Sequence, residues 1–123
     1  MTSNSSGPSK LSENVVEFIL TRDIDQFESL NVSAIARKFS VNRCYLSQRF
    51  KADTKYNLHE YIVMIKVLRS LVLLQEQGDL TIGEVAKRMG FADPDYFRNI
   101  FKKRVGITPG KYKNYFKRTK KGE

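Results

Sequence analysis

Side chains able to do covalent or metal chemistry are scarce in this 123-residue chain. It contains one cysteine, Cys44, and one histidine, His59. A disulfide needs two cysteines, and the common zinc sites need several Cys or His ligands at fixed spacing. The chain also lacks the serine elbow GxSxG, the phosphate loop GxxxxGK(S/T) and the dinucleotide loop GxGxxG. We therefore predict a protein that is not an enzyme and that holds no metal and no cofactor.

Basic side chains are abundant instead. Lys and Arg total 22 against 13 acidic residues, which gives a formal net charge of +9. Residues 31–57 carry +5 and residues 80–123 carry +8, whereas residues 1–30 and 58–79 carry −3 and −1. A surplus of this size on a small chain predicts a polyanionic partner, most often nucleic acid and sometimes an anionic membrane. Two separate basic blocks fit a ligand with two docking places better than they fit one amphipathic membrane helix.

Hydrophobic residues recur at helical spacing and no segment alternates as a strand would, so we predict an all-α fold of about seven helices. Polar residues that can cap a free backbone N–H mark the helix starts. The predicted caps are Ser12, Asn31, Asn42, Thr81 with Glu84, Asp93 before Pro94, and Thr108 before Pro109. Two glycines are predicted to end helices: Gly78, in the position that favours a left-handed residue, and Gly106.

These helices have apolar faces that we expect to be buried, among them Leu46 and Phe50 after Asn42, and Phe97, Ile100 and Phe101 after Pro94. The longest helix, over residues 58–77, has two apolar stripes and is therefore expected to be covered on two sides. The other expected inward residues are Val15, Val16, Ile19 and Leu20 in a first helix over about 13–22; Leu58, Tyr61, Ile62 and Ile65, together with Met64, Leu68, Leu71 and Val72, in the longest helix; and Tyr112, Tyr115 and Phe116 in the last.

Two segments of the chain repeat each other. Residues 30–39 align with residues 80–89 at an offset of 50, and after one extra residue in the second turn the match continues at an offset of 51. The stripe Val32, Ile35, Ala36 and Phe39 reappears as Ile82, Val85, Ala86 and Met89, and the pairs Tyr45-Leu46 and Phe50-Lys51 reappear as Tyr96-Phe97 and Phe101-Lys102. A short capped helix, a tight turn and a second capped helix predict a helix-turn-helix in each copy.

The helix between the two copies has a length that suits duplex DNA. Twenty residues from Leu58 to Gln77 span roughly 30 Å. Successive major-groove faces on one side of B-DNA lie about 34 Å apart. We therefore predict that one monomer places two recognition helices in adjacent major grooves of double-stranded DNA, and that bending of the DNA makes up the difference.

The second half of the chain resembles the C-terminal signature of the AraC/XylS transcription regulators. The resemblance is carried by residues 90–97 (GFADPDYF), by Phe101-Lys102-Lys103, by residues 106–109 (GITP) and by Tyr112, and it extends over about residues 11–117. This chain departs from the family pattern with Asp95 where Ser is usual, Lys66 for Arg, Ser70 for Ala and Lys113 for Arg.

This resemblance implies a bacterial transcription regulator, commonly an activator, that acts in the cytoplasm on the nucleoid. Its expected partners are a double-stranded DNA promoter site and, for an activator, RNA polymerase, with no membrane. Oligomerisation is expected to need a domain absent from this chain. The chain is either a stand-alone regulator controlled by its abundance or the C-terminal piece of a longer protein, and the Ser/Gly/Pro-rich N-terminal segment favours the second interpretation. The predicted segments are a flexible N-terminal segment 1–10, a first helix-turn-helix subdomain 11–57, a connecting helix 58–78, a second subdomain 79–117 and a basic tail 118–123.

Polar positions on the two predicted recognition helices are candidates for contacting DNA. Residues near the start of such a helix face base edges, and cations further along contact phosphates. The predicted base-contacting residues are Arg43, Cys44, Ser47, Gln48, Pro94, Asp95, Arg98 and Asn99, and the predicted phosphate-contacting residues are Lys51, Lys102 and Lys103. Arg43 suits guanine and Gln48 suits adenine. Asp95 either accepts from a cytosine amine or is a capping or solvated residue.

Two other classes of function remain open. A charge of +9 alone suffices for a non-specific nucleic-acid or membrane-surface binder. The chain could also be the DNA-targeting module of a larger sensor or repair protein, with Cys44 as a reactive thiol. Against the thiol, nothing beside Cys44 in the sequence supplies an activating base, and a small groove-facing side chain explains it as well.

Overall fold

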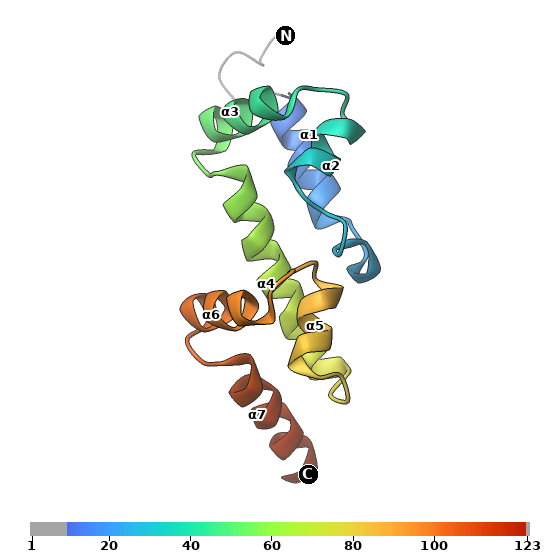
Figure 1. Cartoon of the computed structure of the whole chain (residues 1–123), viewed down its shortest axis with the longest axis vertical. Coiled ribbons are helices and arrows are strands. Elements are labelled where there is room, and N and C mark those ends of the chain that lie inside the picture. The colour runs from blue at the N-terminus through green and yellow to red at the C-terminus, as the bar shows by residue number, and fades with distance from the viewer. Residues whose placement is uncertain (1–9, 123) are drawn as a thin grey trace. The chain divides into compact units, whose positions relative to one another are not determined.

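The computed structural model describes residues 10–122, and within them the chain is all-α (Figure 1). The seven α-helices and one short 3-10 helix are α1 (Lys10–Leu20), η2 (Ile24–Gln26), α2 (Val32–Lys38), α3 (Arg43–Thr54), α4 (Leu58–Glu76), α5 (Ile82–Arg88), α6 (Pro94–Val105) and α7 (Pro109–Gly122). The predicted fold class and number of helices are confirmed.

The chain divides into two compact units, Met1–Val63 and Met64–Glu123, and the division falls inside α4. The scheme with a separate connecting segment at 58–78 stays a prediction. The predicted flexible segment 1–10 lies outside the described residues except for Lys10, which begins α1 instead. The predicted basic tail is helical in its backbone as far as Gly122, because α7 continues through it.

Local capping sets most of the helix starts as predicted. The Asn31 side chain accepts from the Ala34 N–H at 2.8 Å, and the Asn42 side chain accepts from the N–H groups of Cys44 and Tyr45 in α3. Thr81 and Glu84 form a reciprocal capping box, with bonds of 3.0 and 2.8 Å. Such side chains satisfy backbone donors that have no partner inside the helix.

The predicted cap Ser12 is wrong. Ser12 lies inside α1, is 1% exposed, and donates a hydrogen bond to Asp53 at the end of α3. The Ser12 hydroxyl therefore binds a carboxylate of the neighbouring helix α3 and does not cap α1. The start of α1 is also earlier than predicted, at Lys10, and it ends at Leu20.

The first part of the tight turn between the paired helices has the same backbone in both copies of the repeat. Ser40 and Gly90, which are equivalent at the offset of 50, both have left-handed backbones, with φ values of 57° and 84°. In each copy an alanine carbonyl accepts across the turn, Ala36 from Val41 at 3.0 Å and Ala86 from Phe91 at 2.9 Å. Ala36 and Ala86 are buried, at 4% and 0% exposure.

The two predicted glycine ends differ. Gly106 ends α6 with a left-handed φ of 102°, and its N–H donates to the Lys102 carbonyl at 2.8 Å. Gly78 does not adopt a positive φ. The chain leaves α4 through a turn in which the Leu80 N–H donates to the Gln77 carbonyl at 3.0 Å, so no left-handed residue is needed there.

The residues of the predicted apolar faces are buried or half-buried, except for four that are exposed. Leu20, Leu68, Val72 and Tyr115 are exposed, by 43%, 48%, 36% and 63%. In α4, three residues of the first predicted stripe, Leu58, Ile62 and Ile65, are buried. The second predicted stripe is less well covered. The prediction of cover on two sides is therefore wrong at Leu68 and Val72. The last helix contributes Tyr112 and Phe116 to the packed aromatic rings of the second unit, and the exposed Tyr115 ring meets the Phe116 ring edge-on, with centroids 5.5 Å apart.

A lysine is buried in α4 among apolar neighbours. Lys66 is 6% exposed, and its ammonium nitrogen lies 5.9 Å from the centroid of the Phe91 ring. Burial lowers the pKa of Lys66 from its ordinary value, because a charged ammonium is poorly solvated in such a site. The aromatic face offsets part of that cost by attracting the cation.

Candidate nucleic-acid interface

Helix α3 has one buried face and one polar face. Leu46 and Phe50 are 0% and 1% exposed and hold the helix against the first unit. On the other side, Arg43, Cys44, Gln48 and Lys51 are exposed, and Ser47 is half-buried. The sequence-predicted residues of the first copy therefore share one helix, with their polar atoms available to a ligand.

Helix α6 has the same organisation in the second unit. The Asp93 side chain caps it by accepting from the Asp95 N–H at 3.0 Å, and Pro94 is its first residue. Phe97 and Phe101 are fully buried beneath it. The predicted contact residues of this copy, Pro94, Asp95, Arg98, Asn99, Lys102 and Lys103, are all exposed.

Asp95 has a partner on its own helix. Its carboxylate lies 2.9 Å from Nη1 of Arg98, three residues along, and the two side chains are 83% and 48% exposed. An exposed pair of this kind contributes at most about 1 kcal/mol. A ligand can therefore separate the pair at little cost, and until then Asp95 orients the guanidinium along the surface of α6.

Sequence reasoning missed an ion pair at the other end of α3. The Arg49 guanidinium donates to both carboxylate oxygens of Asp53, at 3.2 and 2.8 Å. The hydrogen bond and the negative charge of Asp53 raise the pKa of Arg49. The i,i+4 spacing of the two residues is the signal that could have found this pair.

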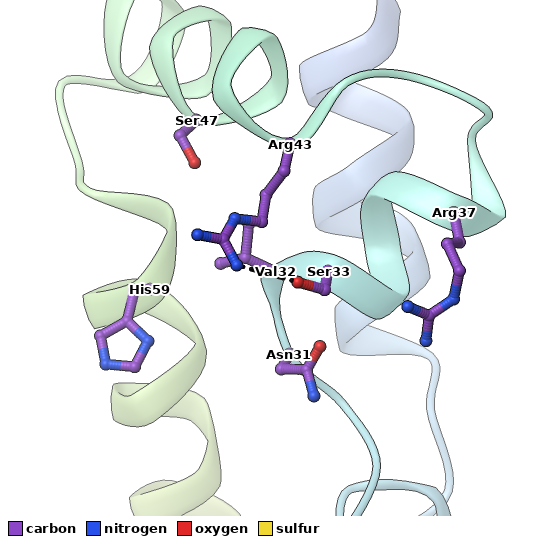
Figure 2. Close-up of a pocket in the computed structure, with 7 residues that line it drawn as sticks. All are labelled: Asn31, Val32, Ser33, Arg37, Arg43, Ser47 and His59. Carbon is purple, nitrogen blue, oxygen red and sulfur yellow. Dashed lines mark hydrogen bonds between the residues drawn. The ribbon is translucent and has the colours of Figure 1, made fainter.

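A polar cavity of about 510 Å³ lies beside the first turn of α3. Figure 2 shows its lining residues, which are Asn31, Val32, Ser33, Arg37, Arg43, Ser47 and His59. Nη1 of Arg43 donates to the Ser33 hydroxyl at 3.1 Å. His59 was not predicted to take part in a site, and only the fold brings the first turn of α4 to this place.

Across residues 10–122, no three His, Cys, Asp or Glu side chains gather as ligands for a metal ion. Among the same residues, none of the helices is both long enough and apolar enough to cross a membrane.

A family model for a helix-turn-helix domain matches residues 35–115, which include α3, α4, α5 and α6 in full. The chain belongs to the AraC/XylS family of helix-turn-helix proteins. The AraC/XylS resemblance carried by residues 90–97 is thereby confirmed. Sequence-specific DNA binding in transcription regulation is the function of this family, and the chain contains its DNA-binding unit.

Individual AraC/XylS-type relatives agree with this assignment. The Msm operon regulatory protein of Streptococcus mutans is 36% identical over 85 residues, which are 69% of this chain and 30% of that protein. The chain thus spans about a third of the length of such curated relatives.

Solved structures share the fold. The C-terminal domain of the response regulator yesN from Fusobacterium nucleatum is 28% identical, with a TM-score of 0.69 over 85% of this chain and 99% of that one. The DNA-binding domain of AdpA, solved in complex with a target DNA, is 24% identical with a TM-score of 0.71, over 93% of this chain and 96% of that one. At this identity, the similarity to the AdpA domain shows a shared fold and nothing more.

Proposed function

We propose that this chain recognises one duplex DNA sequence by placing α3 and α6 in two adjacent major grooves, and that it regulates transcription by doing so. The observation that carries the proposal is that α3 and α6 are built in the same way. Each of these helices is capped at its start, held by buried Leu46 and Phe50 or Phe97 and Phe101, and polar on its exposed face.

Base reading is proposed to fall to polar-face residues in the first two turns of each helix, all exposed except the half-buried Ser47. Gln48 offers a side-chain amide that matches the paired donor and acceptor of adenine, and Arg98 offers a fork that matches guanine. Cys44 and Ser47 in α3, and Pro94, Asp95 and Asn99 in α6, are proposed to complete the two reading faces, with Asp95 also orienting Arg98.

Phosphate contacts fall to cations further along the same helices. Lys51 follows the reading positions of α3, and Lys102 and Lys103 follow those of α6; all three are exposed. An ammonium on a flexible stem attracts a phosphate without reading sequence. These three residues are therefore proposed to position the recognition helices and to make binding depend strongly on salt.

Helix α4 sets the spacing of the two half-sites in this proposal. Its 19 residues give a length of about 28 Å, against roughly 34 Å between successive major-groove faces. The difference is proposed to be met by bending the DNA, so that flexible base steps between the half-sites raise affinity without being touched.

The deciding experiment is selection of preferred duplexes from a random pool, followed by footprinting of the selected site. We expect two short motifs about one helical turn apart and protection on one face of the duplex. A pool that stays random after repeated selection would instead identify a non-specific binder that works through net charge.

The biological role follows from the same binding. We propose that the chain acts at a promoter in the bacterial cytoplasm, on the nucleoid, and that an activating role adds RNA polymerase as a second partner. A reporter gene behind the selected site should change its expression when the chain is produced, and a scrambled site should abolish the response.

A further inference from the structure

The cavity beside α3 is lined by groups that suit an anion. It collects side chains from α2 and its cap, including Arg37 in the last turn of α2, from the first two turns of α3 and from the first turn of α4 (Figure 2). Arg37 and Arg43 bring two positive charges, and none of the lining residues is a carboxylate. Two like charges without a counter-charge in one cavity repel each other, and a bound anion removes that cost.

Existing hydrogen bonds leave the donors of this cavity available. The Ser33 oxygen accepts from Arg43, so its O–H hydrogen is left to donate. The Asn31 side-chain oxygen accepts from the Ala34 N–H, which leaves its amino group as the donor. With Ser47 and the ring of His59, the lining resembles the mixed guanidinium and hydroxyl sets that hold phosphate oxygens.

The second copy of the repeat lacks three of these donors and keeps the others, because Asn31 corresponds to Thr81, Arg37 to Lys87 and Ser47 to Arg98. At the offsets of 50 and 51, Ser33 corresponds to Gly83, Arg43 to Pro94 and His59 to Gly110. Glycine and proline side chains donate no hydrogen bonds. The donors at Ser33, Arg43 and His59 therefore belong to the first unit alone.

We propose that this cavity binds a phosphate group, held by Arg43 and Ser33 with Arg37, Ser47 and His59 around it. A phosphate of the duplex backbone and the phosphate of a small molecule share this chemistry. The duplex is the favoured source, because Arg43 and Ser47 belong to the helix proposed to enter the groove; to that extent the inference rests on the proposed function. Arg43 is then a phosphate ligand and not the guanine reader expected from the sequence.

The test replaces single backbone phosphates of the selected duplex with neutral methylphosphonates. At one position of the first half-site, the wild-type chain should lose about tenfold or more in affinity, which corresponds to one charge-assisted contact. The Arg43→Gln variant should bind the unmodified duplex with an affinity lowered by a similar factor. Its affinity for the methylphosphonate duplex should be no lower than that, because the contact is already lost. Ser33→Ala is a second variant, and unchanged thermal melting of both shows that they fold.

The matched control is Lys38→Gln. Lys38 is an exposed cation next to Arg37 on α2, but it does not line the cavity. This variant also loses one positive charge, so it should remain as sensitive to the methylphosphonate as the wild type. Equal loss of sensitivity in Lys38→Gln would mean that general charge, and not the cavity, makes the contact.

A second arm tests the small-molecule source with inorganic phosphate as the probe. Amide resonances of Ser33, Arg43, Ser47 and His59 are followed by NMR while phosphate is added to the free chain at constant ionic strength. Saturable shifts without any coupling in the duplex experiment assign the cavity to a free phosphate compound. Coupling in the duplex experiment assigns it to the DNA backbone.

Failure of this inference is distinct from failure of the proposed function. The wild-type chain could select a specific site and yet show no coupling between Arg43 and any backbone phosphate and no saturable shift with inorganic phosphate. That result would overturn the proposed phosphate site and leave sequence-specific binding intact. Coupling of Arg43 to a single guanine instead restores base reading. A chain that selects no site at all overturns the proposed function, and the phosphate titration still decides the cavity.

Discussion

The Ser12 hydroxyl donates a hydrogen bond of 2.6 Å to the Asp53 carboxylate, across 41 residues of sequence. The side chain of Asp53 is only 5% exposed and also accepts from Arg49. This carboxylate joins the start of α1 to the last turn of α3. It therefore helps to hold the proposed recognition helix of the first unit in place from the end opposite to its cap at Asn42.

Removing this carboxylate should destabilise the first unit. We expect Asp53→Ala to lower the free energy of unfolding by about 1–3 kcal/mol, because the buried Ser12 hydroxyl loses its acceptor. Urea denaturation followed by circular dichroism measures the change, and Asp25→Ala, at an exposed position of η2, is the control. Equal stability of Asp53→Ala and the wild type would show that the contact between α1 and α3 does not depend on this pair.

Gln48→Ala should weaken binding to the selected site and relax its sequence preference. A lost bidentate contact to a base costs roughly 1–3 kcal/mol on the preferred duplex and little on random DNA. Electrophoretic mobility shifts on both duplexes at one fixed salt concentration measure the two losses. Equal losses on both would assign Gln48 to the phosphate backbone.

Phe101→Ala should unfold or strongly destabilise the second unit. Phe101 is 0% exposed and its ring packs against those of Phe97 and Tyr112, with centroids 5.7 and 5.8 Å away. Truncating a buried phenylalanine costs about 3–5 kcal/mol. The control is Tyr115→Ala, because Tyr115 is 63% exposed. A melting curve of Phe101→Ala that overlays the wild type would overturn this assignment of the core.

The spacing of the half-sites should be strict. Inserting about five base pairs turns the second half-site to the opposite face of the duplex. We expect an affinity loss of roughly 100-fold or more, since only one helix can then bind and the gain from linking two contacts is lost. Quantitative footprinting on the native and lengthened sites measures it. Retained two-site protection on the lengthened duplex would mean that α4 does not act as a rigid spacer.

Features decided within a few residues could be predicted from the sequence, and features decided by a distant neighbour could not. Asn42 caps α3 through N–H groups two and three residues away, so its role is visible locally. Ser12 has the same chemistry, but the tertiary fold gives it Asp53. Periodicity places Tyr115 and Leu68 on apolar faces, yet it does not say how far the covering helices extend.

The candidate site divides in the same way. The exposed rows of α3 and α6 follow from helical spacing once Leu46, Phe50, Phe97 and Phe101 are assigned to the core. The base contacts themselves stay a prediction. The cavity could not be predicted, because Ser33, Arg43 and His59 come from three helices. The sequence does show that these three residues are replaced in the second copy, but this difference can be interpreted only once the fold has brought them together.

The stability of the second unit should rise with pH because of Lys66. Burial lowers the pKa of Lys66 in the folded state, so the unfolded chain binds more protons between that lowered value and the ordinary lysine value of about 10.5. The cost of burying the charge is present in full below the folded-state pKa and disappears as the pH rises through that interval. Lys66→Met should therefore be more stable than the wild type near neutral pH, and the advantage should shrink as the solution becomes alkaline.

The comparison between the two proteins isolates Lys66 from other groups that titrate in the same range. Burial raises the pKa of Tyr61, which makes stability fall as the pH rises through the tyrosine range, but Tyr61 contributes equally to both chains. Urea denaturation of wild type and Lys66→Met at matched pH values gives the difference directly. A difference that stays constant from neutral to alkaline pH would show that the methionine acts by packing alone, and that the ammonium of Lys66 bears no cost of burial beneath Phe91.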